Sequence, residues 1–555
     1  MMADRRISGF VIASLLSVAL GVMLASCGEK DKGTGSAENG ALARQGHEII
    51  KTVCVGCHEA NDKGLPSRIG GARKSPEGWE MTLVRMMTFH GVELTADQRR
   101  AVVKYLSETQ GLAPSESAPY RYALERRTNI VEKAADPDLQ VMCARCHSYA
   151  RVALQRRDAE EWKLLANMHL GQWPTIEYQM LSRDRDWWVD ASTEVPKKLS
   201  KLYPFTTKAW DDWKLAKKQK PEGRWRVVTY MPGASSNMQG QAQNYVDGIL
   251  SVKSKGDDAY EVTYELASDG RTVMSGTYGA LVYSGYEWRA RGKFDGRDFR
   301  EVAAMSPDGN SMSGRWFWHN ANEVGGYIQA VRMDKHISRI MGLNGEGLKR
   351  GQMGDVTILG VGLEGTVDLG PGIAVETVSS SPERITVRAT VAIDAPLGRR
   401  DIRVGKTERA EAIGVYDTID RIVVTPGYGV ARVGGGGGHV VPVSAQFEAV
   451  AYSNGPDKKP GTKDDYRIGL VQADWHTEPH DATAAKMKDQ LFAGKITPQG
   501  RFLPSQAGPN PDRYMSAGNF GDLNVVASIT GSETTVVGKS HLIVTSPRWN
   551  NPPIY

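Results

Sequence analysis

The chain has 555 residues, a length that predicts about four domains. Hydrophobic residues make up 40 % of it and charged residues 24 %, as in ordinary globular proteins, which excludes a disordered or collagenous chain. The 69 basic and 64 acidic side chains leave a formal charge of only +5, too small for the basic surface of a nucleic-acid-binding protein. The 60 glycines favour many turns, and therefore extensive β-structure.

The N-terminal segment, residues 1–27, has the pattern of an export signal. An arginine pair precedes an apolar run from Phe10 to Ser26, and the run ends in Leu-Ala-Ser directly before Cys27. That ending resembles the lipobox of bacterial lipoproteins, in which the cysteine is lipidated, and residues 28–41 would then form a polar tether. The alternatives are a single transmembrane anchor and an ordinary signal that is removed together with Cys27. We expect a periplasmic protein, with a membrane anchor through Cys27 if the lipobox is used.

Two segments, 42–111 and about 120–190, show apolar residues at the three- and four-residue spacing of α-helices. Each segment contains a Cys-x-x-Cys-His motif, followed by a helix that begins at a tryptophan, Trp79 or Trp162. The two segments therefore resemble an internal repeat within one helical domain, 42–190. Within the first segment, Thr95 followed by Gln98 predicts a helix-capping box.

The rest of the chain has a different pattern of charged and apolar residues. Residues 191–224 are rich in lysine and arginine and predict a basic connector, either a docking face or a solvated linker. Beyond them, runs of alternating apolar and polar residues with glycine-containing turns predict three antiparallel β-domains. These are a barrel-like domain over 225–336, an immunoglobulin-like sandwich over 337–420 and a C-terminal β-domain over 421–555.

Four of the five cysteines lie in the two Cys-x-x-Cys-His motifs. This motif is the attachment signature of c-type haem: the two thiols bond to the vinyl groups and the adjacent histidine ligates the iron. A thioredoxin-type pair or half of a zinc site is the alternative for a single motif. Two copies in an exported chain favour two covalent haems. We assign Cys54, Cys57 and His58 to haem 1, and Cys143, Cys146 and His147 to haem 2.

The second axial ligand of each iron must be a thioether or an imidazole on a helix face that meets the haem. One such face carries Trp79, Leu83, Met86 and His90, and the other carries Trp162, Leu165 and His169. When the two tryptophans are aligned, Met86 and His169 both lie seven residues further on, so we predict them as the distal ligands of haem 1 and haem 2. His90 competes for haem 1, and Met168 competes for haem 2. With a methionine ligand, haem 1 would have the higher potential.

The predicted fold is thus multidomain, an α-helical di-haem cytochrome c domain followed by three antiparallel β-domains of barrel or sandwich type. This domain order resembles the alpha subunit of the quinohaemoprotein amine dehydrogenases. The matching motifs are CVGCH, GWEMTLVRMMTFHG, CARCHSYARVALQRRDAEEW, NMHLGQWP and, in the last domain, GRFLPSQAGPNPDRY. They are spread over nearly all of the chain after the signal.

The resemblance implies the di-haem electron-transfer subunit of a periplasmic enzyme that oxidatively deaminates primary amines. It implies a β-propeller subunit and a small subunit bearing cysteine tryptophylquinone as partners, and an external cytochrome c or blue-copper protein as electron acceptor. It also implies Met86 and His169 as distal ligands. A lipid anchor at Cys27 would depart from the family, whose members are soluble periplasmic proteins.

The cysteine count adds a constraint of its own. Every cysteine of the mature protein is committed to haem, apart from the lipidation candidate, so a cysteine-linked quinone cannot form within this chain. We therefore expect no catalytic residue for amine oxidation here; that chemistry would belong to a partner.

The same pattern argues against two other classes of haem enzyme. A di-haem peroxidase would devote most of its length to haem domains, and an alcohol dehydrogenase with a fused cytochrome would show propeller repeats. One alternative would show the same motifs as the amine dehydrogenase subunit: a membrane-anchored di-haem cytochrome c shuttle that serves an unrelated dehydrogenase. Other site signals are weak: the glycine run 434–438 lacks the lysine of a phosphate loop, and Pro479 lies between His476 and His480, which would need a helix to share a metal.

Overall fold

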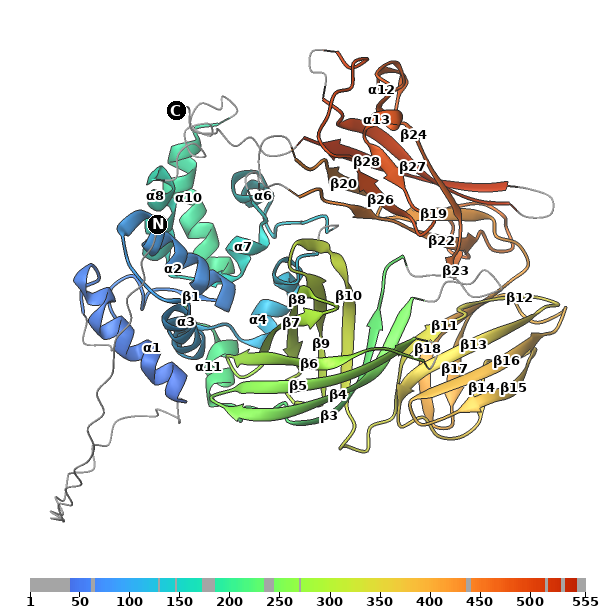
Figure 1. The fold of residues 1–555 in the computed structure, drawn as a ribbon, viewed down its shortest axis with the longest axis horizontal. Coiled ribbons are helices and arrows are strands. Elements are labelled where there is room, and N and C mark those ends of the chain that lie inside the picture. Colours follow the sequence, from blue (N-terminus) through green and yellow to red (C-terminus); the bar gives the residue numbers. More distant parts are fainter. Residues whose placement is uncertain are drawn as a thin grey trace, which may run out of the picture. The chain divides into compact units, whose positions relative to one another are not determined.

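The computed structural model describes residues 40–60, 65–127, 130–144, 147–171, 185–233, 244–268, 271–435, 441–514, 518–530 and 535–546 (Figure 1). The predicted export signal, Cys27 and most of the polar tether lie outside the described residues. Within the described ranges, no helix is both long and apolar enough to cross a membrane.

The N-terminal part of the described chain is helical, as the apolar spacing predicts. Its longer helices are α1 (Ala41–Thr52), α2 (Pro76–His90), α3 (Ala96–Gln110), α8 (Ala159–Met168), α10 (Trp187–Leu202) and α11 (Lys208–Leu215). Its short helical turns are η1 (Cys54–Gly56), α4 (Pro114–Ser117), η2 (Ala118–Tyr120), α5 (Arg121–Leu124), α6 (Pro137–Cys143), α7 (Ala150–Ala153) and η3 (His169–Gly171). The predicted capping box at the start of α3 is confirmed: the Gln98 amide donates to Thr95 Oγ1 at 3.2 Å, and the Thr95 amide donates to Gln98 Oε1 at 2.8 Å.

The helical domain has two hydrophobic cores, one for each half of the predicted repeat. Trp79 lies in the first core and Trp162 in the second, and each is only 2 % exposed. Both helices begin one residue after a side-chain N-cap, Ser75 for α2 and Asp158 for α8. Each tryptophan ring also faces a basic side chain from the residue before its N-cap, Lys74 for Trp79 and Arg157 for Trp162. The repeat therefore extends from the motifs to the packing of the helices that follow them.

A two-stranded ladder joins the two halves. β1 (Arg73–Lys74) pairs antiparallel with β2 (Gln155–Arg156), which sets Arg73 opposite Arg156. Both guanidinium groups bond to the carboxylate of Glu116: Arg73 donates to both oxygens at 2.9 Å, and Arg156 Nε donates to Oε1 at 3.0 Å. All three side chains are buried, so one carboxylate is shared by two cations inside the domain.

The segment 191–224 differs from the expected basic connector, because it is an integral part of the helical domain. α10 packs Ala191, Val195 and Leu199 into the second core, and α11 buries Trp210 and Trp213. The apolar residues of α10 recur every four positions among the lysines, so the helix buries one face and turns its charges outward.

The next domain is a closed eight-stranded barrel with the strand order β10-β3-β4-β5-β6-β7-β8-β9, in which all neighbours pair antiparallel. Its strands are β3 (Gly223–Tyr230), β4 (Tyr245–Gly256), β5 (Ala259–Ser268), β6 (Arg271–Tyr283), β7 (Glu287–Phe294), β8 (Arg297–Met305), β9 (Ser311–Trp318) and β10 (Ala321–Arg332). Alternate residues of each strand point inward and form one core, which includes Trp225, Tyr260 and Trp288.

One end of the barrel contacts the helical domain. Lys104 of α3 donates to Asp258 Oδ2 at 2.9 Å in the turn between β4 and β5. In the turn between β6 and β7, the Ser284 carbonyl accepts from the Trp213 indole at 2.9 Å, and the Tyr286 hydroxyl bonds to Ser117 at 2.8 Å. These buried polar contacts fix the turns of this end against the helices.

Two further β-domains follow. In the first, the sheets β11-β13-β16-β15 and β12-β18-β17-β14 share one core, as in a sandwich. Its strands are β11 (Arg339–Asn344), β12 (Gly347–Lys349), β13 (Met353–Val361), β14 (Val367–Asp368), β15 (Ile373–Ser380), β16 (Arg384–Val391), β17 (Gly398–Val404) and β18 (Thr407–Tyr416). The pair β12–β18 is parallel, so the sandwich is not purely antiparallel.

The last domain contains the sheets β19-β22-β23, β20-β28-β27-β24 and β21-β26-β25 around one core. Its elements are β19 (Arg421–Thr425), β20 (Tyr428–Arg432), β21 (Ala445–Gln446), β22 (Glu448–Ser453), β23 (Tyr466–Val471), β24 (Asp474–Pro479), α12 (Ala482–Lys486), α13 (Asp489–Phe492), β25 (Gly494–Ile496), β26 (Arg501–Pro504), β27 (Gly521–Thr530) and β28 (Thr535–Thr545). β20 and β28 pair parallel, again unlike the antiparallel expectation.

We expect Glu116→Gln to lower the free energy of unfolding by about 3–5 kcal/mol, because it leaves two buried guanidinium groups without a counter-charge. Burial alone would raise the pKa of Glu116, but its bonds to Arg73 and the charges of Arg156 and Arg73 lower it. The stabilisation is therefore complete above the ordinary carboxyl pKa and is lost as the pH falls through the lower folded value. Denaturant unfolding of the haem-loaded chain at several pH values measures both effects.

The matched control is Glu194→Gln, which removes an exposed carboxylate that pairs with Lys197 on α10. This variant should unfold like the wild type. Equal stabilities of the Glu116 and Glu194 variants would contradict the role assigned to Glu116.

Candidate haem sites

A cavity of about 240 Å³ opens between the helices of the second half. Its walls include the residues predicted for haem 2, namely Cys143, His147 and His169, together with Met168. Cys146 lies outside the described residues. Apolar side chains of α6, α8 and α10 complete the walls: Met142, Trp162, Leu165, Trp187, Ala191, Val195 and Leu199. An apolar chamber with two imidazoles and a cysteine is suited to a covalently attached haem.

The two imidazoles of this cavity are held in the same way. His147 Nδ1 donates to the Ser148 carbonyl at 2.9 Å, and His169 Nδ1 donates to the Leu165 carbonyl at 2.9 Å. Each ring thus keeps Nε2 as its acceptor nitrogen, which is the atom that a metal takes. Burial lowers the pKa of both histidines, so the neutral form that binds iron is favoured.

Two arginines line the same cavity, and sequence reasoning did not find them. Arg85 comes from α2 and Arg151 from α7. Burial and the charge of Arg151 lower the pKa of Arg85. Among the described residues, no carboxylate pairs with Arg85, and its buried Nε has no hydrogen-bond partner; its other nitrogens reach Met168 Sδ at 3.7 Å and Thr82 Oγ1 at 3.3 Å. An uncompensated buried cation fits an anionic group of the ligand, such as a haem propionate.

The residues predicted to hold haem 1 are more exposed to solvent than the described residues predicted for haem 2. Cys54 lies in η1 and packs against the first core, and Cys57 is exposed at the end of that turn. His58 Nδ1 donates to the Ser67 carbonyl at 2.9 Å, which leaves Nε2 free as in the other two histidines. Met86 is half-buried on α2, whereas His90 is exposed at the end of the helix. The greater burial of Met86 is consistent with the distal role predicted for it, but its position relative to the iron remains a prediction.

Helix α2 contributes to both halves through different faces. Trp79 and Leu83 point into the first core, on the face that also carries Met86. Met81 and Arg85, one turn apart, lie on the other face and line the cavity of the second half. Met81 therefore lines the cavity of the second half although it belongs to the first half by sequence.

A histidine cluster outside the helical domain differs from the pair that the sequence suggests. His480 lies next to His541 of β28, not His476, and the two rings stack at 3.9 Å. His541 Nε2 is 2.6 Å from Asp522 Oδ1. One ligand atom from each of His480, Asp522 and His541 lies within 4.8 Å of the other two, so this group has the spacing of a possible metal site, built from other residues than the pair His476 and His480.

Comparison with known proteins identifies the domains. Residues 44–210 match the haem-binding region of "quinohemoprotein amine dehydrogenase A, alpha subunit". Residues 218–333, 338–417 and 422–554 match domains II, III and IV of the same alpha subunit. The chain belongs to the quinohaemoprotein amine dehydrogenase alpha-subunit family. The resemblance noted in the sequence is thereby confirmed, and the helical region is a haem-binding domain.

Other comparisons add little. No curated protein matches the chain. A designed fluorescence-activating β-barrel is 21 % identical and covers 20 % of this chain and 91 % of its own, with a TM-score of 0.15. Mouse protocadherin PcdhgC3 is 10 % identical and covers 44 % of this chain and 77 % of its own, with a TM-score of 0.16. A SusE-like polysaccharide-binding protein of Bacteroides thetaiotaomicron is 11 % identical and covers 57 % of this chain and 57 % of its own, with a TM-score of 0.13. Such low TM-scores carry no argument.

Replacing the predicted distal ligand of haem 2 tests its assignment. We expect His169→Met to raise the midpoint potential of haem 2 by a sizeable part of the ~0.8 V range that axial ligands span, because a thioether stabilises ferrous iron. His169→Ala should let the ferric haem bind added imidazole and regain its spectrum. A redox titration followed by visible absorption measures both. Met168→Leu is the control; if that variant shifts the potential and His169→Met does not, Met168 is the ligand.

Removing the charge of Arg85 should move the same potential in the opposite direction. Arg85→Gln is expected to lower the haem 2 midpoint, because a nearby cation disfavours the more positive ferric state. Arg388→Gln removes the same charge from the sandwich domain and should leave the midpoint unchanged. An unaltered potential in the Arg85 variant would show that this guanidinium is remote from the iron.

Proposed function

We propose that the chain is the di-haem electron-transfer subunit of a periplasmic quinohaemoprotein amine dehydrogenase. In this role it takes electrons from a tryptophan-derived quinone on a partner, which deaminates primary amines, and delivers them to an external cytochrome c or copper protein. The observation that carries the proposal is the cavity in which His147 and His169 meet, within a domain of the haem-binding family. Bound haem iron supplies one-electron chemistry there, cycling between the ferric and ferrous states.

The side chains of the helical domain prepare this site. The backbone carbonyls of Ser148 and Leu165 fix the orientations of His147 and His169, so each ring needs no reorganisation to act as a ligand. The buried rings of Trp162 and Trp187 exclude water from the cavity. Arg85 lines the cavity without a carboxylate partner among the described residues, so its positive charge would pair with an anionic group of a bound haem and would disfavour the ferric state.

Two redox centres in one domain would lie close together, since α2 supplies residues to both. Met86 is on the face of α2 that meets the first core, and Met81 and Arg85 line the second cavity. This shared helix supports an internal transfer step between the two haems that needs no movement of domains.

The catalytic quinone is assigned to a partner. The resemblance implies a small subunit with cysteine tryptophylquinone and a β-propeller subunit, and this chain has no uncommitted cysteine with which to build such a group. The three β-domains would then serve as a scaffold and docking surface for those partners. The predicted export signal supports a periplasmic location for the complex, and lipidation of Cys27 would attach it to the membrane.

The test is the visible spectrum of the complex, purified from its native host through a tag on this chain. We expect reduced c-type haem bands after a primary amine is added without oxygen or another acceptor. In the same experiment with the His169→Ala variant, the ratio of reduced haem 1 to reduced haem 2 should differ from that of the wild-type complex. A tertiary amine is the control and should give no reduction.

An unchanged spectrum would contradict the proposal, provided that dithionite still reduces both haems. In that case the electrons of an amine do not reach this chain, and the membrane-anchored shuttle that serves another dehydrogenase becomes the better description.

A further inference from the structure

The interior of the barrel contains a second cavity, separate from the haem sites. It has a volume of about 60 Å³ and lies toward the end of the barrel at which β7 joins β8 and β9 joins β10. The opposite end carries the turns that contact the helical domain. The cavity is therefore located away from the haem-binding helices.

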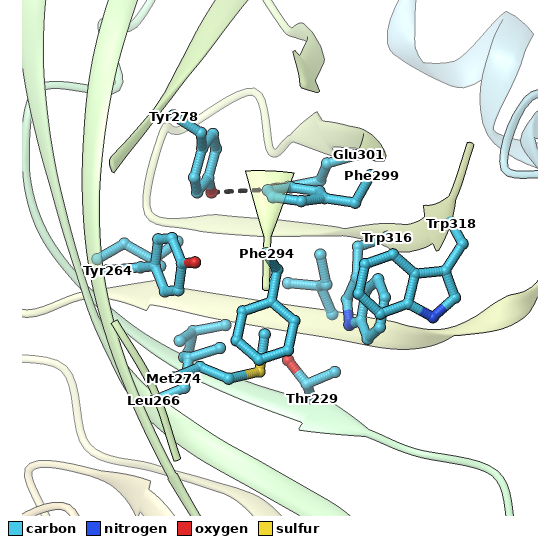
Figure 2. A pocket seen from close by; sticks show the side chains of 13 residues that line it. Thr229, Tyr264, Leu266, Met274, Tyr278, Phe294, Phe299, Glu301, Trp316 and Trp318 are labelled. Carbon is cyan, nitrogen blue, oxygen red and sulfur yellow. Dashed lines mark hydrogen bonds between the residues drawn. The ribbon is translucent and has the colours of Figure 1, made fainter. Parts of the chain in front are cut away.

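Six aromatic rings line the cavity, together with aliphatic side chains (Figure 2). Tyr264 and Tyr278 lie on one side, and Trp316 and Trp318 lie on the other, with Phe294 between them. The guanidinium of Arg297 already lies 4.1 Å from the ring centroid of Trp318, so this indole attracts a cation at the rim. Electron-rich faces around a small chamber are a recognised environment for organic cations.

One acidic group stands among these rings. Glu301 of β8 is 4 % exposed, and Tyr278 donates to its Oε2 at 2.9 Å. Among the described residues, no side chain forms an ion pair with Glu301, and none donates a hydrogen bond to its Oε1. The indole of Trp288 is turned toward the carboxyl group but does not complete a hydrogen bond. Burial raises the pKa of Glu301 to about 7, although Tyr278 and Trp288 act to lower it.

The carboxylate therefore lacks a cation. Above neutral pH, Glu301 would carry a negative charge inside an apolar chamber, and an unpaired buried charge is costly. A ligand that brings a positive charge and N–H donors would satisfy both Oε1 and the charge. A neutral apolar ligand would satisfy neither.

We propose that the barrel cavity binds a small primary alkylammonium ion, with Glu301 as its carboxylate partner and the faces of Tyr264, Trp316 and Trp318 as its walls. The cavity is smaller than the ~150 Å³ that admits benzene in other proteins, so it selects ions with one or two carbons over aromatic amines. The site is a binding site rather than a catalytic one, and it does not rest on the proposed electron-transfer function.

The experiment is a calorimetric titration of the haem-loaded full-length chain, without partner subunits, with ethylammonium chloride at pH 8.5. We expect saturable binding at one site. Benzylammonium, which is too large, and ethanol, which has no charge, should give no such binding. The visible spectrum is recorded in parallel and should not change, since the haems take no part.

Glu301→Gln is expected to weaken binding by about 10- to 100-fold, as loss of a charged hydrogen-bond partner does. Glu261→Gln is the matched control, because this carboxylate lies on another strand of the same barrel, β5, and on the outside, where it pairs with Lys255. It should bind ethylammonium like the wild type.

Two further measurements keep the proposal falsifiable if Glu301→Gln does not fold. Wild-type affinity should fall as the pH drops below about 7, because burial raises the pKa of Glu301 to about 7 and its carboxyl group becomes neutral at lower pH. Trp318→Leu at the rim should weaken binding several-fold by removing an aromatic wall.

Absence of saturable binding by the wild type overturns the proposal. So does binding that is equal in the Glu301 and Glu261 variants, or binding that persists unchanged at pH 5.5. None of these results bears on reduction of the haems by an amine, so this proposal and the proposed function fail separately.

Discussion

The helical domain depends on one buried carboxylate. Glu116 accepts hydrogen bonds from Arg73 and Arg156, which are opposite each other in the short ladder between the two halves of the repeat. Two like charges in an apolar interior repel each other and are poorly solvated, so neither could occupy its position without the shared anion. Because each arginine directly precedes the residues that start a tryptophan-bearing helix, this contact also sets the positions of α2 and α8. The cavity and both predicted iron-ligand sets are arranged around those helices.

Much of the architecture could be predicted from local signals. The Cys-x-x-Cys-His motifs, the helical spacing around them and the Thr95 capping box act over a few residues, and a single sequence shows them directly. The alternation in the C-terminal two thirds indicated β-domains for the same reason. The prediction of a basic connector over 191–224 rested on the charge of the segment and overlooked the spacing of Ala191, Val195 and Leu199, which marks a buried helix face.

The rest of the site could not be predicted, because it depends on contacts between distant segments. Arg85 belongs to the first half by sequence and to the cavity of the second half in space. Glu301 is an ordinary alternating residue of a strand, and only the closure of the barrel reveals that its carboxyl group faces rings from four other strands. His480 contacts His541 because β24 and β28 both pair with β27. The sequence spacing of neighbouring residues does not reveal such a contact.

Helix α2 would link the evolution of the two proposed haem sites. Its two functional faces are separated by a fixed rotation, and insertion or deletion of one residue between Met81 and Met86 would turn one face by about 100° against the other. Single substitutions can still adjust either face. Changes of length cannot be tolerated in this helix, however, since they would preserve one centre only by displacing the other. Lineages of this subunit should therefore vary in the length of their loops while α2 keeps its count of residues.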